Sequence, residues 1–194
     1  MPATDNELVD AWFRLGFGQQ QAYGIRELPD AGWPVGVREA EERDVEALIE
    51  LDPELASHQR LSPVFSGWGA GEDVDALRKE ILEDIAAETV GLLVAEREGR
   101  IVGLLSVCPL ELSEMHYGLA RPERMSFLGF AVTHPEVRGA GAGLALTQAA
   151  FAWARAHGYA AMVVDWRVTN LLSSRFWTAR GFRPTFLRLH RLIA

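Results

Sequence analysis

Cysteine is scarce in this sequence. Cys108 is the only one, so no disulfide can form within the chain. Because Cys108 lies in an apolar stretch just before Pro109, we interpret it as a small core residue. Folds built on internal disulfides are therefore excluded, and a reducing cytoplasm is the expected location.

Long apolar runs and a leader-like N-terminus are also missing. No apolar stretch approaches the roughly 20 residues that a membrane-spanning helix needs. Residues 1–10 have neither the basic region nor the apolar region of a secretory signal. We therefore expect no membrane partner.

Positive charge is in short supply as well. Lysine and arginine total 19 against 27 aspartates and glutamates, which gives a formal net charge of −8. Nucleic-acid binding needs clustered cations, so we expect no nucleic-acid partner. A negatively charged protein instead attracts cationic ligands such as amines. The histidines do not have the spacing of metal ligands, and we expect no metal site.

The chain of 194 residues has the length of one domain with a substantial core. We expect residues 1–34 to form an N-terminal extension, with a helix over 7–15 and a strand over 20–28. Residues 35–194 are expected to form the main domain. One pattern links the two parts: segments 12–17 and 177–182 both have a tryptophan four residues before a Gly-Phe pair. This repeated pattern has three interpretations. It is a chance similarity, the result of a duplication, or the mark of an additional helix and strand that complete a sheet or a dimer.

Hydrophobic periodicity divides the main domain into strands and helices. The expected strands are 35–38, 91–96, 100–107, 125–132, 160–164 and 183–193. The expected helices are 40–51, 73–87, 142–157 and 171–180, with loops over 58–71 and 109–124. This order predicts an α/β fold with a central mixed sheet of about six or seven strands and about four flanking helices.

The most informative segment is the glycine-rich loop over 138–143, which lies between an apolar strand and a helix. Glycines allow the backbone to approach a ligand closely, and the start of a helix binds phosphate groups. Arg138 adds a fixed positive charge. A P-loop is excluded because no lysine follows Gly143. In a Rossmann turn Asp165 would bind ribose, but the glycine spacing does not fit. A turn without a ligand remains an alternative.

Two motifs in the main domain resemble those of the GNAT superfamily of acyl-CoA-dependent N-acyltransferases. Arg138-x-x-Gly141-x-Gly143 resembles the pyrophosphate signature of that family. A second motif follows further along the chain, Asn170-x-x-Ser173-x-x-Phe176-Trp177-x-x-x-Gly181-Phe182. The resemblance covers residues 35–194. It implies a GNAT-like sheet that splays between the strands ending at Val132 and starting at Ala160, and acetyl-CoA or another acyl-CoA as cosubstrate.

The resemblance also implies the site residues. Expected cofactor-binding residues are Phe130, Ala131, Val132, Arg138, Gly139, Ala140, Gly141, Ala142, Gly143, Leu144, Asn170 and Ser173. Expected catalytic residues are Asp165, Asn170 and Trp177. The sequence departs from the family at Trp177, where a tyrosine usually protonates the leaving thiolate, because an indole cannot act as an acid near neutral pH. On the helix over 171–180 we expect Trp177 to face the thioester and Leu172 to face the core.

A general base is not evident on the strand over 125–132, where some family members keep one. Asp165 corresponds in position to a glutamate that acts as base in the ribosomal-protein acetyltransferase branch. Alternatively, Asp165 is a strand-end acid bonded to nearby N–H groups or to Arg167. Glu114 and Glu136 are more remote candidates. Other residues expected near the cleft are His58, Phe65, Trp68, His116 and Tyr117.

The resulting hypothesis is an N-acyltransferase, in its simplest form an N-acetyltransferase. It would transfer an acyl group from acyl-CoA to a primary amine of a small molecule or peptide by direct attack. The alternative, motivated by Trp177, is a non-catalytic acyl-CoA-binding module of the same fold, and a nicotinamide-dependent enzyme is a third possibility. The family resemblance and the additional N-terminal strand also suggest a homodimer.

Overall fold

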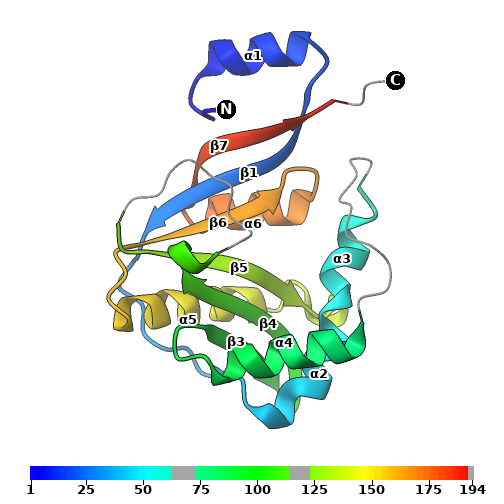
Figure 1. Ribbon diagram of the computed structural model, residues 1–194, viewed down its shortest axis with the longest axis vertical. Coiled ribbons are helices and arrows are strands. Elements are labelled where there is room, and N and C mark those ends of the chain that lie inside the picture. The colour runs from blue at the N-terminus through cyan, green and yellow to red at the C-terminus, as the bar shows by residue number, and fades with distance from the viewer. Residues whose placement is uncertain (63–72, 114–122, 192–194) are drawn as a thin grey trace.

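The computed structural model describes residues 1–62, 73–113 and 123–191, and these residues build a central sheet of seven strands (Figure 1). The strands are β1 (Gly18–Glu27), β2 (Val37–Glu39), β3 (Gly91–Arg97), β4 (Arg100–Pro109), β5 (Met125–Thr133), β6 (Ala161–Arg167) and β7 (Arg183–His190). Their order is β2-β3-β4-β5-β6-β1-β7. Only the pairing of β5 with β6 is parallel. The predicted mixed α/β fold is confirmed.

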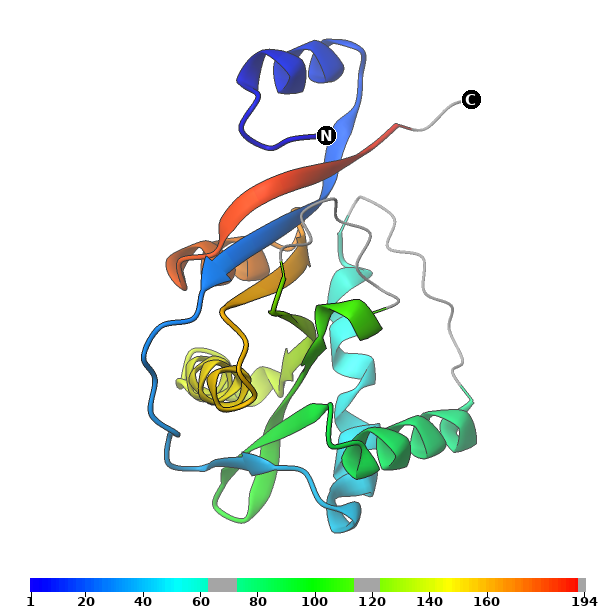
Figure 2. The same cartoon turned by 60° about the vertical axis from the view of Figure 1, so that its left-hand side comes forward.

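Helices cover both faces of the sheet (Figure 2). The helices α5 (Ala142–Ala156) and α6 (Leu171–Ala179) lie on one face. The other face carries α2 (Val45–Leu51), α3 (Pro53–Gln59) and α4 (Val74–Ala86). Alternation along β3 explains the two cores: Leu93 packs on the α5 side, and Leu92 and Val94 pack on the α2 and α4 side. The helix α1 (Asn6–Arg14) lies beyond the β1 and β7 end of the sheet (Figure 1).

The strand β1 lies between β6 and β7 and pairs antiparallel with both. Residues that precede α1 contact the opposite edge of β7. Ala3 N donates to Thr185 O at 2.9 Å, and Leu187 N donates to Met1 O at 2.8 Å. The segment that we predicted as an extension thus supplies a strand of the central sheet and encloses β7 from both sides. The boundary between residues 34 and 35 stays a prediction.

The repeated sequence pattern of segments 12–17 and 177–182 has a counterpart in the structure. In both segments the glycine has a positive φ, 79° in the first and 81° in the second. In both, the phenylalanine N–H donates to the tryptophan carbonyl at 3.2 Å, and the two rings meet edge to face. Each segment therefore ends a helix with the same left-handed glycine turn.

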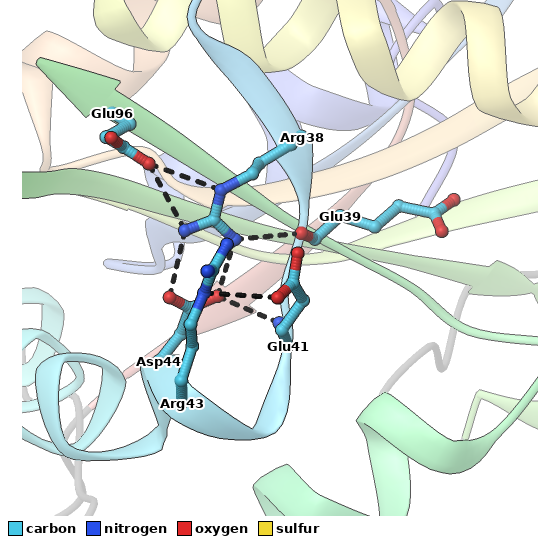
Figure 3. A network of polar contacts seen from close by, with 6 residues as sticks. All are labelled: Arg38, Glu39, Glu41, Arg43, Asp44 and Glu96. Carbon is cyan, nitrogen blue, oxygen red and sulfur yellow. Dashed lines mark hydrogen bonds and ion pairs between the residues drawn. The ribbon is translucent and has the colours of Figure 1, made fainter. Parts of the chain in front are cut away.

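Arg38 fixes the short strand β2 to its neighbours (Figure 3). Its guanidinium donates to the two carboxylate oxygens of Asp44 at 2.6 and 2.9 Å, and to Glu96 at 3.2 Å. The hydrogen bond with Asp44 raises the pKa of Arg38, and the same bond lowers the pKa of Asp44. The network joins β2 to β3 and to the turn before α2, so we assign it a structural role.

Several predicted boundaries need correction. His58 lies in the helix α3 and not in a loop, and Pro53 stands in the first turn of that helix. The strand that we ended at residue 164 continues to Arg167 as β6, so Asp165 lies within a strand. Phe65, Trp68, Glu114, His116 and Tyr117 lie outside the described residues. Over the described ranges, no helix has the length and apolarity needed to cross a membrane.

Candidate active site

The strands β5 and β6 separate at the centre of the sheet. Their parallel pairing ends at Leu128 and Val164, although β5 continues to Thr133 and β6 to Arg167. Gly129 is an additional residue in the β4–β5 ladder, so β5 has a bulge at the point where pairing with β6 stops. The predicted splay is confirmed, and it opens a cleft between the two strands.

A first cavity of about 460 Å³ lies at the β5 side of this cleft. A volume of this size is typical of small-ligand pockets. The predicted cofactor-binding residues that line it are Ala131, Val132, Arg138, Gly139, Gly141, Ala142, Gly143, Leu144, Asn170 and Ser173. Two predicted residues do not line it. Phe130 lines a second cavity, and the carbonyl of Ala140 accepts a hydrogen bond from Arg97 at 3.0 Å.

The glycine-rich loop places the start of α5 at the wall of the first cavity. Gly141 caps the helix with φ of 94°, and a Cβ atom added there would meet no atom within 4 Å. The first turn of α5 carries no acidic residue, and its N–H groups have no partner within the helix. Arg138 and Arg180 also line the cavity. This arrangement suits a phosphate or pyrophosphate group.

The free edge of β5 offers backbone groups to the cleft. His134 N donates to Val102 O of β4 at 2.9 Å. Residues that bond across an antiparallel ladder alternate with residues that point away, and the register is regular from Thr133 to Ala131. Val132 therefore directs its N–H toward β4, whereas Ala131 and Thr133 direct theirs into the cleft.

Asn170 connects α6 with α3 across the first cavity. Its Oδ1 accepts from Ser173 N at 3.2 Å and so caps α6. The same oxygen lies 3.3 Å from Nε2 of His58. The amide oxygen of Asn170 is thus engaged in holding two helices in place, and a direct catalytic role for Asn170 stays a prediction.

Trp177 is buried, with 6% of its surface exposed. Its ring contacts Phe176 and Phe182 edge to face, and it also lines both cavities. The expectation that Leu172 faces the core was wrong, since Leu172 is 56% exposed. Leu172 instead lines the first cavity, and Trp177 is the residue of α6 that is buried.

The second cavity, of about 590 Å³, lies on the β6 side of the cleft. It meets the first cavity at Leu55, Ala131, Ser173 and Trp177, which line both. Its sheet wall includes the polar side chains of Asp165, Gln21, Arg167 and Arg188. Its helix wall includes Asp52, Asp73 and Glu80. The two cavities are therefore neighbours that share these four residues as a common boundary.

Asp165 has an environment suited to proton transfer. Burial raises the pKa of its carboxyl group to about 6, against the opposing effects of Arg167, Gln21 and Arg188. Gln21 Nε2 donates to Asp165 Oδ2 at 2.6 Å. The partner that the structure shows is thus a side chain of β1, whereas the sequence suggested nearby N–H groups or Arg167. Gln21 and Arg188 were missed because they lie outside both motifs.

The remaining candidate residues, Glu136 and Cys108, are not among the residues that line the two cavities. Glu136 is exposed and lies 3.7 Å from the ring of His134. Burial raises the pKa of Cys108 to about 11, which makes it a poor nucleophile. Over residues 1–62, 73–113 and 123–191, no three His, Cys, Asp or Glu side chains are grouped to hold a metal ion.

Comparison with known families identifies the main domain. The profile of the Acetyltransferase (GNAT) family matches residues 37–182. This match includes the glycine-rich loop, Asp165 and Trp177, and it excludes β1 and β7. No curated protein sequence matches the chain.

Solved structures share the fold at low sequence identity. The aminoglycoside N-acetyltransferase AAC(6')-Iy in complex with CoA has a TM-score of 0.64 and 20% identity, covering 86% of this chain and 97% of its own. The ribosomal-protein-alanine N-acetyltransferase from Brucella melitensis has a TM-score of 0.59 and 21% identity, covering 81% and 99%. The aminoglycoside 6'-N-acetyltransferase AAC(6')-IG from Acinetobacter haemolyticus has a TM-score of 0.62 and 16% identity, covering 81% and 97%.

Proposed function

Since the chain belongs to the GNAT family of acetyltransferases, we propose that it transfers an acetyl group from acetyl-CoA to a primary amine. The observation that carries this proposal is the pair of cavities that meet at Ala131, Ser173 and Trp177. One has the cations and helix start that suit a pyrophosphate, and the other has a carboxylate that suits proton removal. The thioester would lie where they meet.

The first cavity would hold coenzyme A. The N–H groups at the start of α5, with Arg138 and Arg180, would bind the phosphates. The pantetheine amides would bond to the backbone of Ala131 and Thr133, as an added strand does at an open sheet edge. These contacts keep the thioester beside β5, in reach of the second cavity.

The second cavity would hold the acceptor amine with Asp165 as general base. The neutral amine attacks the thioester carbonyl carbon, and an ionised Asp165 takes the proton that the nitrogen must lose to form the amide and later releases this proton to water. The tetrahedral intermediate then collapses, the C–S bond breaks, and the electron pair leaves with sulfur. With a thiol pKa near 8.5, the thiolate leaves readily and takes a proton from water. This route needs no acid at Trp177.

The acceptor class is not fixed by the fold. The solved relatives include N-acetyltransferases of aminoglycosides and of a ribosomal-protein alanine, so both small molecules and peptide N-termini are acceptable within this architecture. We include both in the proposal. A homodimer and cytoplasmic location remain predictions.

Release of free thiol from acetyl-CoA tests the proposal. The purified chain is incubated with acetyl-CoA and a panel of amines, and the thiol is detected with a chromogenic disulfide. Amine-dependent release above the rate without enzyme is expected. Binding of acetyl-CoA without release across the panel would contradict catalysis and favour a non-catalytic binding module.

A further inference from the structure

We propose that the acceptor is a primary amine that also carries a carboxylate, and that Arg167 and Arg188 bind this carboxylate beside Asp165. The inference rests on the proposed function and specifies its substrate class. It comes from the sheet wall of the second cavity, where cationic groups stand next to the candidate base.

The positions of these side chains follow from the sheet register. Arg167 follows Asp165 by two residues on β6, so both side chains lie on the same face, with their Cα atoms roughly 7 Å apart. Gln21 pairs with Arg167 on one side and with Arg188 on the other. The two arginines therefore flank one residue of β1 and face the same cavity.

The guanidinium groups share a neutral acceptor. Gln21 Oε1 accepts from Arg167 Nη1 and from Arg188 Nη1, each at 3.4 Å. Among the ion pairs between described residues, none includes Arg167. Burial lowers the pKa of Arg167; the charge of Asp165 opposes this shift and the charge of Arg188 adds to it. A ligand carboxylate would offset the effects of burial and of Arg188 and form the strong paired hydrogen bonds that guanidinium groups make.

Gln21 also lies between the candidate base and the cations and hydrogen-bonds to all three, although the charges of Arg167 and Arg188 still lower the pKa of Asp165. Its amide nitrogen bonds to Asp165 and its amide oxygen bonds to the arginines. A direct ion pair between Asp165 and Arg167 would lower the pKa of the carboxyl group and use the cation that the ligand needs. The glutamine thus orders two neighbouring subsites, one for the amine and one for the carboxylate. It lies on β1, outside residues 37–182 of the family match.

The opposite wall of the cavity suggests a competing acceptor. Asp52, Asp73 and Glu80 line the helix side, and acidic side chains suit a polycationic amine. We favour the amino carboxylate because the arginines lie on the same wall as Asp165, next to the reacting nitrogen. An α-amino acid has its nitrogen and carboxylate close enough to reach both groups.

Matched pairs of acceptors test this inference. Several α-amino acids are compared with their carboxamides, which have nearly the same shape but no negative charge, and spermidine serves as the polycation. Rates are expressed per concentration of neutral amine, because the carboxylate changes the amine pKa. We expect kcat/KM to be roughly tenfold or more higher for the acids, as a charge-assisted pair would give.

Variants test which side chains produce the preference for the acid over the carboxamide. Arg167→Gln and Arg188→Gln should each reduce the preference for the acid, while Arg188→Lys should retain part of it. Arg183→Gln is the matched control, because Arg183 lies on β7 but pairs with Glu27 on the exposed surface. It should leave the preference unchanged.

The outcomes distinguish the amino-carboxylate inference from the proposed acetyl transfer. Equal rates for acids and carboxamides, or a preference for spermidine, would overturn the amino-carboxylate inference while leaving acetyl transfer in place. A preference that persists in Arg167→Gln and Arg188→Gln would overturn the assignment of the arginines. If acetyl-CoA neither binds nor reacts with any amine, the proposed function fails and this inference fails with it.

Discussion

At the scale of single residues, Asp165 is the group whose chemistry depends most on its surroundings. Burial raises its pKa to about 6, and the 2.6 Å bond from Gln21 fixes its orientation. Charged or titratable groups face it from every neighbouring element: Tyr23 from β1, Arg167 from β6, Arg188 from β7, and Asp52, Asp73 and Glu80 from the helix wall. Its protonation should therefore control the rate within the acidic range.

We expect kcat/KM to rise with pH through about 6, because only the ionised carboxylate can accept a proton. Asp165→Asn should lose this acidic limb and lower the rate by roughly 10² to 10⁴-fold. Rates are measured from pH 5 to pH 8 and corrected for the neutral fraction of the amine. Glu136→Gln, at an exposed carboxylate outside both cavities, should keep the limb. An unchanged limb in Asp165→Asn would rule out this base.

The same group should influence folding stability. Because the folded pKa of about 6 lies above the ordinary value of 3.8, the folded state binds more protons than the unfolded state between these values. Stability should fall as pH rises through this window. The free energy of unfolding of Asp165→Asn should exceed that of the original protein by roughly 1–2 kcal/mol at pH 7.5, and this difference should shrink toward pH 4.5. Urea denaturation at both pH values measures it, and a loss of stability at pH 7.5 would contradict the assigned environment.

Trp177 allows a test of the departure from the family. Trp177→Tyr replaces a buried indole by a smaller ring that carries an acidic hydroxyl. We expect the variant to fold with a loss of about 1 kcal/mol and to keep at least the original kcat, because the phenol can protonate the thiolate. Thermal unfolding and steady-state rates measure both. A large fall in kcat in a folded variant would show that the indole itself shapes the site.

At the scale of elements, the turn before α5 determines whether a phosphate can approach. Gly141 has φ of 94°, and the space at its missing side chain is open. Gly141→Glu fills this space and places a negative charge at the positive end of a helix. We expect the affinity for acetyl-CoA to fall roughly a hundredfold or more, as measured by calorimetry.

Gly99→Glu is the matched control for this prediction. Gly99 has φ of 74° in the turn between β3 and β4, and it also has no atom near the added side chain. The two variants therefore share the strain of a left-handed residue and the added charge. Unchanged acetyl-CoA affinity in a folded Gly141→Glu would contradict the role of the loop. An equal loss of acetyl-CoA affinity in Gly99→Glu would show that the added charge or the backbone strain causes the loss, wherever it is placed.

At the scale of the whole molecule, the N-terminal segment is part of the sheet. A Cβ atom added at Gly24 of β1 would lie 2.7 Å from Cζ3 of Trp166 and 3.4 Å from Cβ of Phe182. Gly24→Ala should therefore destabilise the whole chain by about 1–3 kcal/mol, with one cooperative transition. Gly18→Ala on the same strand, with its nearest contact at 4.0 Å, should change stability little. Equal stability of the two variants would indicate an independent extension.

Much of the site was predictable because its determinants are local. The glycine-rich loop, the strand before it and the helix after it each follow from consecutive residues with clear patterns, whereas the splay of that strand was implied by the family resemblance. The place of β1 was not predictable in this way, because the contact of Gln21 with Asp165 joins residues 144 positions apart. The helix α3 was missed because a helix of seven residues that begins with a proline gives too short a periodic pattern.

The central claim is that the first cavity binds acetyl-CoA. Calorimetric titration of the purified chain with acetyl-CoA, with NAD titrated in parallel, tests it most directly. We predict micromolar binding of acetyl-CoA at one site per chain and no response to NAD. Absence of acetyl-CoA binding by the folded protein would contradict the assignment and leave the glycine-rich loop as a structural turn.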